Sequence, residues 1–231
     1  MEEFQLWAAC KDGKLQEVQE LLQNSEINAN WPNYQLRPPF YVACKEGQIE
    51  IVKLLLNDNR IDVNKGECDG QTPFHAACRR GHIEIVKLLL NDKRIDVNRA
   101  MDGGQTPCYL TCLFGQIEIV KLLLNDNRVD INKPNNNGST PFYIACYDGY
   151  IEIVKYMLAN GTKVSLSKDK RGKTVSIANI VRNRIEIGNF QERKRYGAVA
   201  ELLESFERNP NETKVKLRFQ LGFAGTKSIY F

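Results

Sequence analysis

The sequence lacks several features that would mark a membrane, secreted or catalytic protein. Among its 231 residues, no apolar run approaches the roughly 18 that a membrane-spanning helix needs. The opening residues, Met1-Glu2-Glu3-Phe4, have neither the basic nor the apolar segment of a secretory signal. We therefore expect no membrane span and a location in the cytoplasm or the nucleus. With 42% hydrophobic residues, the chain can still bury a sizeable core.

Histidine is scarce, since only His75 and His82 are present, and both occupy positions that recur along the chain. No nucleophile–base pair, nucleotide-binding glycine loop or metal-ligand cluster stands out. A glutamate that recurs every 34 residues from Glu50 to Glu152 is interpreted as the solvent face of a repeated helix rather than as paired catalytic carboxylates. We predict a non-enzymatic protein with no cofactor, no metal and no small-molecule substrate.

Five of the seven cysteines are spaced 34 residues apart, a pattern that neither disulfides nor zinc ligands show. A fixed period of this length indicates a stacked repeat protein, in which the same buried slot recurs in each unit. We expect these five to be reduced core residues, and Cys68, outside the series, to be an exposed thiol. The periodic cysteines are Cys10, Cys44, Cys78, Cys112 and Cys146.

Prolines and glycines follow the same period and outline the unit. In residues 71–104, Thr72 and Pro73 predict the start of a short helix and Gly81 its end. A second helix is expected from about Ile83 to Leu90, followed by a hairpin-like loop that turns back at residues 103–104. Two short helices and a loop cannot bury their apolar faces alone, so the units must stack.

These residues resemble a known family. Gly70-Gln71-Thr72-Pro73-Phe74-His75-Ala76-Ala77, with the leucines of 88–90 behind it, is similar to the ankyrin repeat, whose signature is Thr-Pro-Leu-His-x-Ala. The resemblance implies an all-α solenoid of helix–turn–helix units with projecting hairpin-like loops. We expect six units, with atypical capping repeats at both ends, and a C-terminal extension over 211–231 that packs on the last repeat. The units are 4–33, 34–68, 69–102, 103–136, 137–170 and 171–210, the last with an insertion near 182–195.

Three departures from the family pattern carry expectations of their own. Each unit has 34 residues instead of the usual 33, and the extra residue falls in loops such as Asn59-Arg60, where we expect a longer or bulged loop. Leu36 replaces the turn glycine that Gly70 represents, so we expect the loop 31–36 to have its own conformation. Tyrosine replaces the family histidine except at His75, which leaves open whether those units make the histidine's hydrogen bond. These tyrosines are Tyr41, Tyr109 and Tyr143.

The resemblance implies protein binding through the loop tips and the concave face of the first helices. In the family, the two residues before the turn glycine face this surface. Here Leu113-Phe114 is apolar among polar pairs, and we interpret it as an interface centre edged by charged and aromatic side chains. The alternative is that Phe114 packs under a loop and only Leu113 is exposed. The edging residues are Lys45, Arg79, Arg80 and Tyr147.

The irregular first loop is a second candidate contact, although its residues could serve local packing alone: Trp31, Tyr34 and Arg37. We expect a protein partner, which the sequence does not identify, and a monomer when the chain is alone. The resemblance also implies that asparagines at one loop position can be hydroxylated. The alternative role of these asparagines is to hydrogen-bond the loop that they open: Asn64, Asn98 and Asn132.

Positive charge gathers at the C-terminal end, since residues 163–231 have a net charge of +8 against −4 for residues 1–162. This favours a runner-up function, binding of nucleic acid or an anionic surface. Aromatic residues are not interleaved with these charges, which makes nucleic acid an unexpected partner. A third possibility is a structural part of a larger complex, with Ile229-Tyr230-Phe231 inserted into a neighbour. The basic residues are Arg182, Arg184, Arg193, Lys194, Arg195, Lys214, Lys216 and Arg218.

Overall fold

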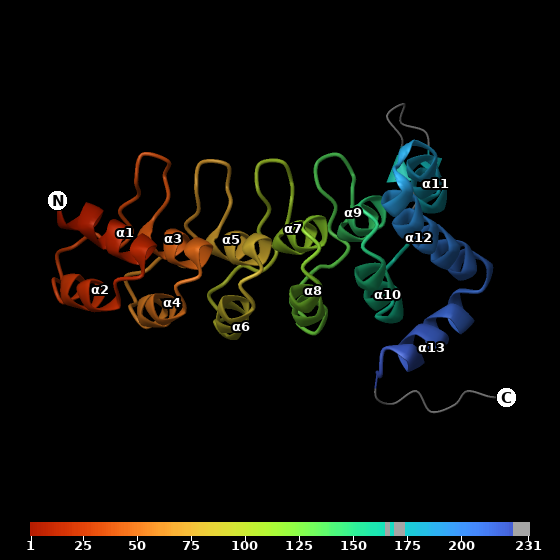
Figure 1. Ribbon diagram of the computed structural model, residues 1–231. Coiled ribbons are helices and arrows are strands. Elements are labelled where there is room, and N and C mark those ends of the chain that lie inside the picture. Colours follow the sequence, from red (N-terminus) through yellow and green to blue (C-terminus); the bar gives the residue numbers. More distant parts are fainter. Residues whose placement is uncertain (165–166, 169–173, 224–231) are drawn as a thin grey trace. The chain divides into compact units, whose positions relative to one another are not determined.

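The computed structural model describes residues 1–164, 167–168 and 174–223, and the segment Ile229-Tyr230-Phe231 lies outside this range. The chain divides into two compact units, Met1–Thr111 and Cys112–Phe231, each described here by itself. Pairs of antiparallel helices succeed one another along the chain (Figure 1). This arrangement confirms the predicted all-α repeat fold. None of the described helices is both long and apolar enough to cross a membrane.

The first unit contains three helix pairs and the start of a fourth. The first helices of the pairs form one row in which α1 packs on α3 and α3 on α5, and the second helices lie in a row beneath them (Figure 1). The loops between successive pairs project from the first row, on the side away from the second. The helices are α1 (Glu2–Asp12), α2 (Leu15–Leu22), α3 (Pro39–Glu46), α4 (Ile49–Leu56), α5 (Pro73–Arg80), α6 (Ile83–Asn91) and the start of α7 (Pro107–Leu113).

The pair α5–α6 shows why the sequence folds in this way. The Thr72 side chain accepts a hydrogen bond from the backbone N–H of His75, and Pro73 occupies the first turn, where a missing N–H costs nothing. Gly81 ends α5 in the left-handed region at φ 79°, which glycine adopts without strain. Both helices predicted for this repeat are confirmed.

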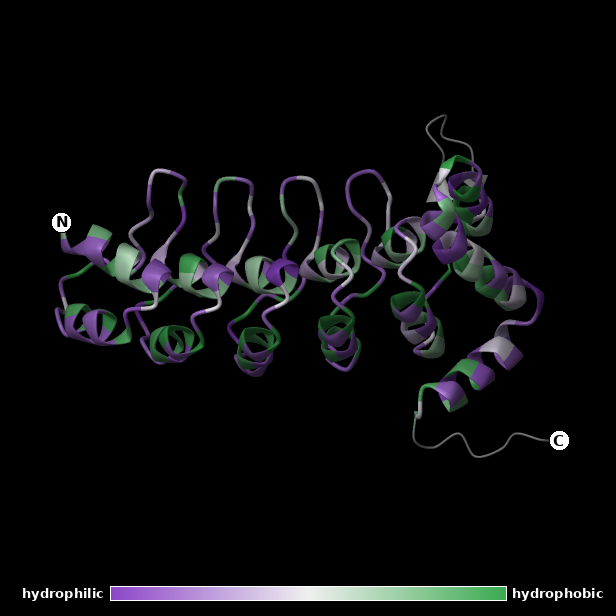
Figure 2. Ribbon diagram, in the orientation of Figure 1, coloured by the Kyte–Doolittle hydropathy of each residue, from purple (hydrophilic) through white to green (hydrophobic). Residues whose placement is uncertain are grey.

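The core lies between the two rows of helices. Helices α4 and α6 are mostly hydrophobic, whereas the projecting loops are mostly hydrophilic (Figure 2). The five periodic cysteines are buried and Cys68 is exposed, and all seven cysteines are present as thiols, as predicted. Burial raises the pKa of the Cys10 thiol to about 12, because an apolar environment disfavours the thiolate.

The second unit completes the fourth pair with α8, continues with the regular pair α9–α10 and ends differently. A short antiparallel ribbon, β1 (Ser167–Lys168) and β2 (Thr174–Val175), precedes α11, and the expected insertion lies at the end of α11 and the start of α12. Helices α11 and α12 pack on each other and on α9, while α13 packs on α10 and α12. The helices are α8 (Ile117–Leu124), α9 (Pro141–Tyr147), α10 (Ile151–Ala159), α11 (Ile177–Ile187), α12 (Phe190–Arg208) and α13 (Pro210–Gln220).

The first projecting loop does not have a conformation of its own, so that expectation is wrong. Asn33 N–H donates to the Arg37 carbonyl (3.1 Å) and Leu36 N–H to the Asn33 carbonyl (2.9 Å). The same two bonds recur in the next loop, where Gly70 stands in place of Leu36. Leu36 adopts the left-handed φ of 59° that glycine supplies elsewhere. The side-chain oxygen of Asn33 holds this turn by accepting the N–H groups of Gln35 and Arg37.

The residues around the extra loop position tie each loop to the preceding repeat. The Arg60 guanidinium forms an ion pair with Asp58 (2.7 Å) and donates to the Leu22 carbonyl (2.9 Å) at the end of α2. Arg94 repeats the arrangement, since it pairs with Asp92 (2.6 Å) and reaches a carbonyl at the end of α4. The last carbonyls of a helix have no partner within the helix, so these arginines cap it from the next loop.

Asn64 joins consecutive loops. Its side-chain nitrogen donates to the Arg94 carbonyl (2.7 Å), and its oxygen accepts the Asp96 N–H (2.9 Å). Asn30 makes the corresponding bonds to Arg60 and Asp62 one repeat earlier. The side chain of Asn64 therefore hydrogen-bonds a loop, as expected, but it is the loop before the next asparagine, Asn98, and not the one that Asn64 opens.

Candidate interaction surfaces

Three of the predicted contact residues lie in the last turns of first helices in the first unit. Lys45 is near the end of α3, and Arg79 and Arg80 end α5. Glycines in the left-handed region follow both helices, so these turns are fixed in place. Arg79 and Arg80 are exposed and Lys45 is half-buried. The structure thus presents cationic side chains from two adjacent repeats.

These side chains share a hollow with Arg37, which the first projecting loop supplies. The hollow has a volume of about 200 Å³ and contains four cations and one carboxylate. It is lined by Arg37, Tyr41, Lys45, Glu67, Gln71, Ala76, Arg79 and Arg80. Four residues predicted as partner contacts on separate grounds therefore meet at one place within this unit.

A hydrogen-bonded group forms one wall of the hollow. The hydroxyl of the fully buried Tyr41 donates to Glu67 Oε1 (2.6 Å) and lies 2.8 Å from Gln71 Oε1. Arg37 Nε donates to the other carboxylate oxygen of Glu67 at 2.6 Å. The Arg37 guanidinium also lies over the Tyr41 ring. Burial and the Glu67 carboxylate raise the pKa of Tyr41 well above its usual range, so the hydroxyl keeps its proton.

Tyr41 occupies the position of the family histidine, and its contacts can be compared with those of His75. His75 bonds backward to Thr72 and forward, through Nε2, to the Gln105 carbonyl (3.2 Å). Tyr41 reaches forward by the same 30 residues, but to the side chain of Gln71. The contact between repeats is kept through a side chain instead of a backbone carbonyl, while the one hydroxyl proton goes to Glu67. Burial lowers the pKa of His75 to about 4, so its ring is neutral.

The other two residues of the first loop differ in exposure. Tyr34 is 91% exposed at the loop tip, and Trp31 is half-buried. Arg37 belongs to the ion pair in the hollow, so only Tyr34 is fully presented to solvent. Sequence reasoning selected Arg37 but missed Glu67 and Gln71, which lie 30 or more positions along the chain. The one sequence signal that pointed to them was Tyr41, which replaces the family histidine.

In the second unit, Phe114 is 41% exposed and Leu113 is half-buried. The alternative in which Phe114 lies beneath a loop and Leu113 alone is exposed is therefore wrong. Phe114 directly follows α7, whereas the aromatic Phe142 in α9 is fully buried. Phe114 is thus a partly exposed aromatic side chain at a repeat position that is polar in the other units.

Tyr147 packs against the chain's own insertion. Its ring stacks on Tyr143 (5.9 Å between centroids), and the Arg184 guanidinium of α11 lies 4.4 Å from its centroid. Arg184 also lies 5.2 Å from the Tyr196 ring and donates to the Tyr196 hydroxyl (2.9 Å). The insertion therefore places an arginine between two tyrosines. Tyr147 supports this contact, and its ring is half-buried.

Most of the basic C-terminal residues also serve internal contacts. Arg182 pairs with Glu204, Arg193 donates to the Gly188 carbonyl (2.7 Å), and Arg195 lies over two tyrosine rings. Aromatic rings do lie among these charges, contrary to the expectation from sequence: Tyr147 and Tyr150 come from α9 and the turn before α10, and Tyr196 follows Arg195 directly in α12. The arginines occupy faces of these rings, which removes them as stacking platforms for bases.

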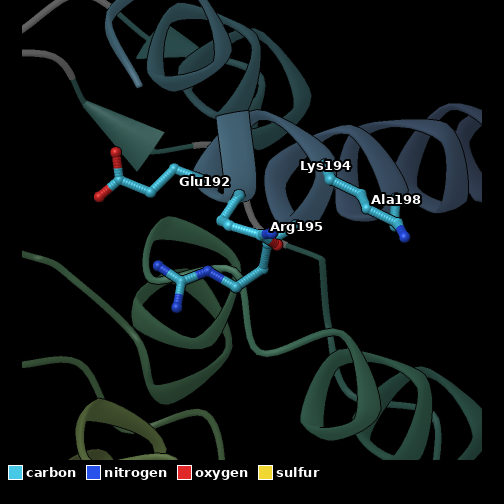
Figure 3. A pocket seen from close by; sticks show the side chains of 5 residues that line it. Glu192, Lys194, Arg195 and Ala198 are labelled. Atoms are coloured by element: carbon cyan, nitrogen blue, oxygen red, sulfur yellow. The ribbon is translucent and has the colours of Figure 1, made fainter. Parts of the chain in front are cut away.

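A second hollow of about 480 Å³ follows the start of α12 and is lined by Gln191, Glu192, Lys194, Arg195 and Ala198. The side chains of Glu192 and Lys194 extend in opposite directions (Figure 3). Glu192 is also engaged in the capping box of α12, where its carboxylate accepts the Asn189 N–H (2.9 Å). These groups do not converge on a point that a ligand could occupy.

Across residues 1–164, 167–168 and 174–223, no three His, Cys, Asp or Glu side chains are grouped so that they could hold a metal ion. Both histidines contact backbone carbonyls of neighbouring repeats, His75 that of Gln105 and His82 that of Lys45 (3.0 Å).

Comparison with known families gives one result. The model for ankyrin repeats in three copies matches residues 3–66, 57–135 and 94–168. No curated protein matches this chain closely enough to count as a relative.

Proposed function

Because this chain belongs to the ankyrin repeat family, whose repeats are generally protein–protein interaction modules and typically not enzymes, we propose that it is a non-enzymatic adaptor. It binds another protein through its loop tips and the ends of its first helices. The contact residues are Tyr34, Lys45, Arg79, Arg80, Leu113 and Phe114. Trp31, Arg37 and Tyr147 support the surface by holding its loops and rings.

The observation that carries this proposal is the exposure of Phe114. Burial of an aromatic side chain stabilises a protein by roughly 1.5–3 kcal/mol relative to leaving it exposed. Phe114 is 41% exposed. A charged residue can occupy the equivalent position in another repeat, as Arg80 does, so the fold itself does not require an aromatic side chain there. Aromatic side chains, phenylalanine among them, are enriched in protein–protein interfaces relative to the rest of the surface.

The test is an affinity capture from a nuclease-treated cell lysate, with partners identified by mass spectrometry. The wild-type protein is compared with the double variant Leu113→Asp/Phe114→Asp. Phe190→Asp is the matched control, because Phe190 is 79% exposed and belongs to α12 rather than to the end of a first helix. Far-ultraviolet circular dichroism verifies that all three proteins are folded.

We expect a protein that wild type and Phe190→Asp retain and that the double variant loses. Capture of the same proteins by all three would overturn the proposal for Phe114. Retention from an untreated lysate that is lost from the nuclease-treated lysate would instead show that nucleic acid mediates the capture.

A further inference from the structure

The charge of the hollow in the first unit differs from that of its surroundings. Residues 1–111 contain 13 Lys and Arg against 16 Asp and Glu, so the unit as a whole is acidic. The hollow, in contrast, is lined by four cations and one carboxylate. A local region of positive charge on an acidic unit attracts an anion to that place rather than to the whole surface.

The single carboxylate of the hollow is already engaged. Glu67 accepts from Arg37 through one oxygen and from Tyr41 through the other, both at 2.6 Å. Its side chain is only 10% exposed. The charge of Glu67 is therefore directed toward Arg37 and does not neutralise the cations across the hollow.

Two of the other cations, Lys45 and Arg80, are oriented by the fold but are not neutralised to the same degree as Arg37. Lys45 lies 3.8 Å from Glu46, a long distance for an ion pair between partly exposed side chains. Arg80 forms no ion pair with any residue in the described ranges, and it is exposed at the end of α5. An incoming carboxylate would meet a planar guanidinium with parallel N–H donors, the geometry that binds carboxylates in a bidentate manner.

The size of the hollow restricts what can enter. Pockets for drug-sized ligands generally have about 300–1,000 Å³, whereas this one has about 200 Å³. That volume suits one acidic side chain better than a nucleotide or a metabolite. The polar wall of Tyr41, Gln71 and Glu67 also disfavours an apolar anchor, which would leave these groups without water.

We propose that this hollow receives a glutamate or aspartate side chain from an acidic segment of the partner protein. The proposal rests on the proposed function, that the chain binds a protein, and adds the chemistry of that partner. Arg79 and Arg80 contact the carboxylate, Lys45 supplies additional charge, and the pair of Arg37 with Glu67 fixes the wall. Phe114 in the second unit contributes a separate, apolar contact.

The experiment measures binding of fluorescently labelled twelve-residue peptides to the full chain by fluorescence anisotropy. The probe alternates glutamate with alanine, and its control alternates glutamine with alanine. The test variant is Arg79→Gln/Arg80→Gln. The matched variant Lys53→Gln/Lys87→Gln removes the same charge from α4 and α6, where both lysines pair with glutamates at 2.7 Å.

We expect wild type to bind the glutamate peptide at least tenfold more tightly than the glutamine peptide. The affinity should fall about tenfold in the Arg79/Arg80 variant and by less than twofold in the Lys53/Lys87 variant. It should also weaken as salt is raised, because partly exposed charges are screened. Equal losses in both variants, or no preference for glutamate, would overturn the proposal.

Two further probes separate other sources of negative charge. A peptide with phosphoserine in place of glutamate, bound when the glutamate peptide is not, would show that the hollow takes phosphate and would refute the carboxylate proposal. A twelve-nucleotide single strand of thymidines, bound more tightly than the glutamate peptide, would refute a protein partner for this site. Because these tests do not involve Phe114, their failure is distinct from failure of the capture experiment.

Discussion

Arg60 closes the end of a helix in the preceding repeat: its Nη2 lies 2.9 Å from the backbone carbonyl oxygen of Leu22, the last residue of α2. Its Nη1 reaches two further carbonyls, those of Asn24 and Ser25. Asp58 holds the guanidinium in this orientation through an ion pair. The polar loop that contains the extra residue of the 34-residue repeat thus links two consecutive repeats through Arg60. The sequence had predicted only that this loop is longer or bulged.

The first prediction concerns this link. Arg60→Met keeps most of the aliphatic stem but removes every donor, so the carbonyl of Leu22 at the end of α2 and those of Asn24 and Ser25 in the following turn must bond to water instead. We expect the free energy of unfolding to fall by about 1 kcal/mol, the usual net value of hydrogen bonds at a partly exposed site. Urea denaturation followed by circular dichroism measures the change.

The control for Arg60 is Lys53→Met on α4. Lys53 forms an ion pair with Glu50, three residues earlier on the same exposed helix face. Pairs of this kind contribute a few tenths of a kcal/mol at most. A loss in Lys53→Met as large as that in Arg60→Met would show that Arg60 acts through its charge alone.

The second prediction concerns backbone strain at Leu36, the one described non-glycine residue with positive φ. A left-handed conformation costs a residue with a Cβ atom roughly 1–2 kcal/mol. Leu36→Gly removes that cost but adds flexibility to the unfolded chain, which costs about 0.5–1 kcal/mol. Since the Leu36 side chain is 53% exposed, little burial is lost, and we expect a net gain of about 0.5–1 kcal/mol in thermal or urea denaturation.

The reciprocal variant tests the same explanation. Gly70→Leu places a Cβ atom at φ 78° in the next loop, where the nearest atom, Asp102 Oδ1, would lie 3.4 Å away. Space is available, so the expected loss of about 1 kcal/mol is conformational. If Leu36→Gly destabilised the protein instead, packing of the leucine side chain would outweigh the strain.

How far the sequence predicts this structure depends on the distance along the chain over which each contact acts. The ends of α5 follow from Thr72, Pro73 and Gly81, each of which acts on its own turn, so they were predictable. The pairing of Tyr41 with Glu67 joins residues 26 apart, and neither residue alone indicates the other. The hollow therefore emerged only from the stacking of repeats.

The insertion was the least predictable part, because it breaks the period from which everything else was derived. Its extra residues were recognised, and so was their positive charge. Arg184 contacts Tyr147, 37 residues earlier. This contact depends on the direction in which α11 leaves the stack of repeats. No repeated position specifies that direction.

The third prediction concerns pH. Burial lowers the pKa of His75 in the folded protein to about 4, below the value of about 6.5 in the unfolded chain. As pH falls from about 6.5 toward 4, the unfolded state takes up a proton that the folded state does not, so stability is lost over that range. Between pH 7 and pH 5 the loss should be about 2 kcal/mol in wild type.

The measurement is urea denaturation at pH 7, 6 and 5 for wild type and His75→Gln. The variant is less stable throughout, because the bonds to Thr72 and Gln105 change, but its stability should depend less on pH. His82→Gln is the control, since the His82 ring is only half-buried. A pH dependence that is equally steep in His75→Gln would assign it to other groups.

The last prediction distinguishes a structural from a recognition role for the basic C-terminal end. Arg184 lies 4.4 Å and 5.2 Å from the ring centroids of Tyr147 and Tyr196, and it bonds to the Tyr196 hydroxyl. Arg184→Lys keeps the charge but loses the planar group that lies between the rings, and contacts of this type contribute about 1 kcal/mol. We expect Arg184→Lys to destabilise the protein by about that amount, whereas Lys194→Gln, which removes a charge near the hollow on α12, should leave stability within about 0.5 kcal/mol.

If the basic C-terminal end bound nucleic acid instead, the order of the two variants would reverse in a binding assay. Lys194→Gln would weaken binding, and Arg184→Lys, with its charge intact, would not. Thermal denaturation of both variants, beside titration with a labelled single-stranded oligonucleotide at two salt concentrations, separates the two roles, because only phosphate binding weakens steeply with salt.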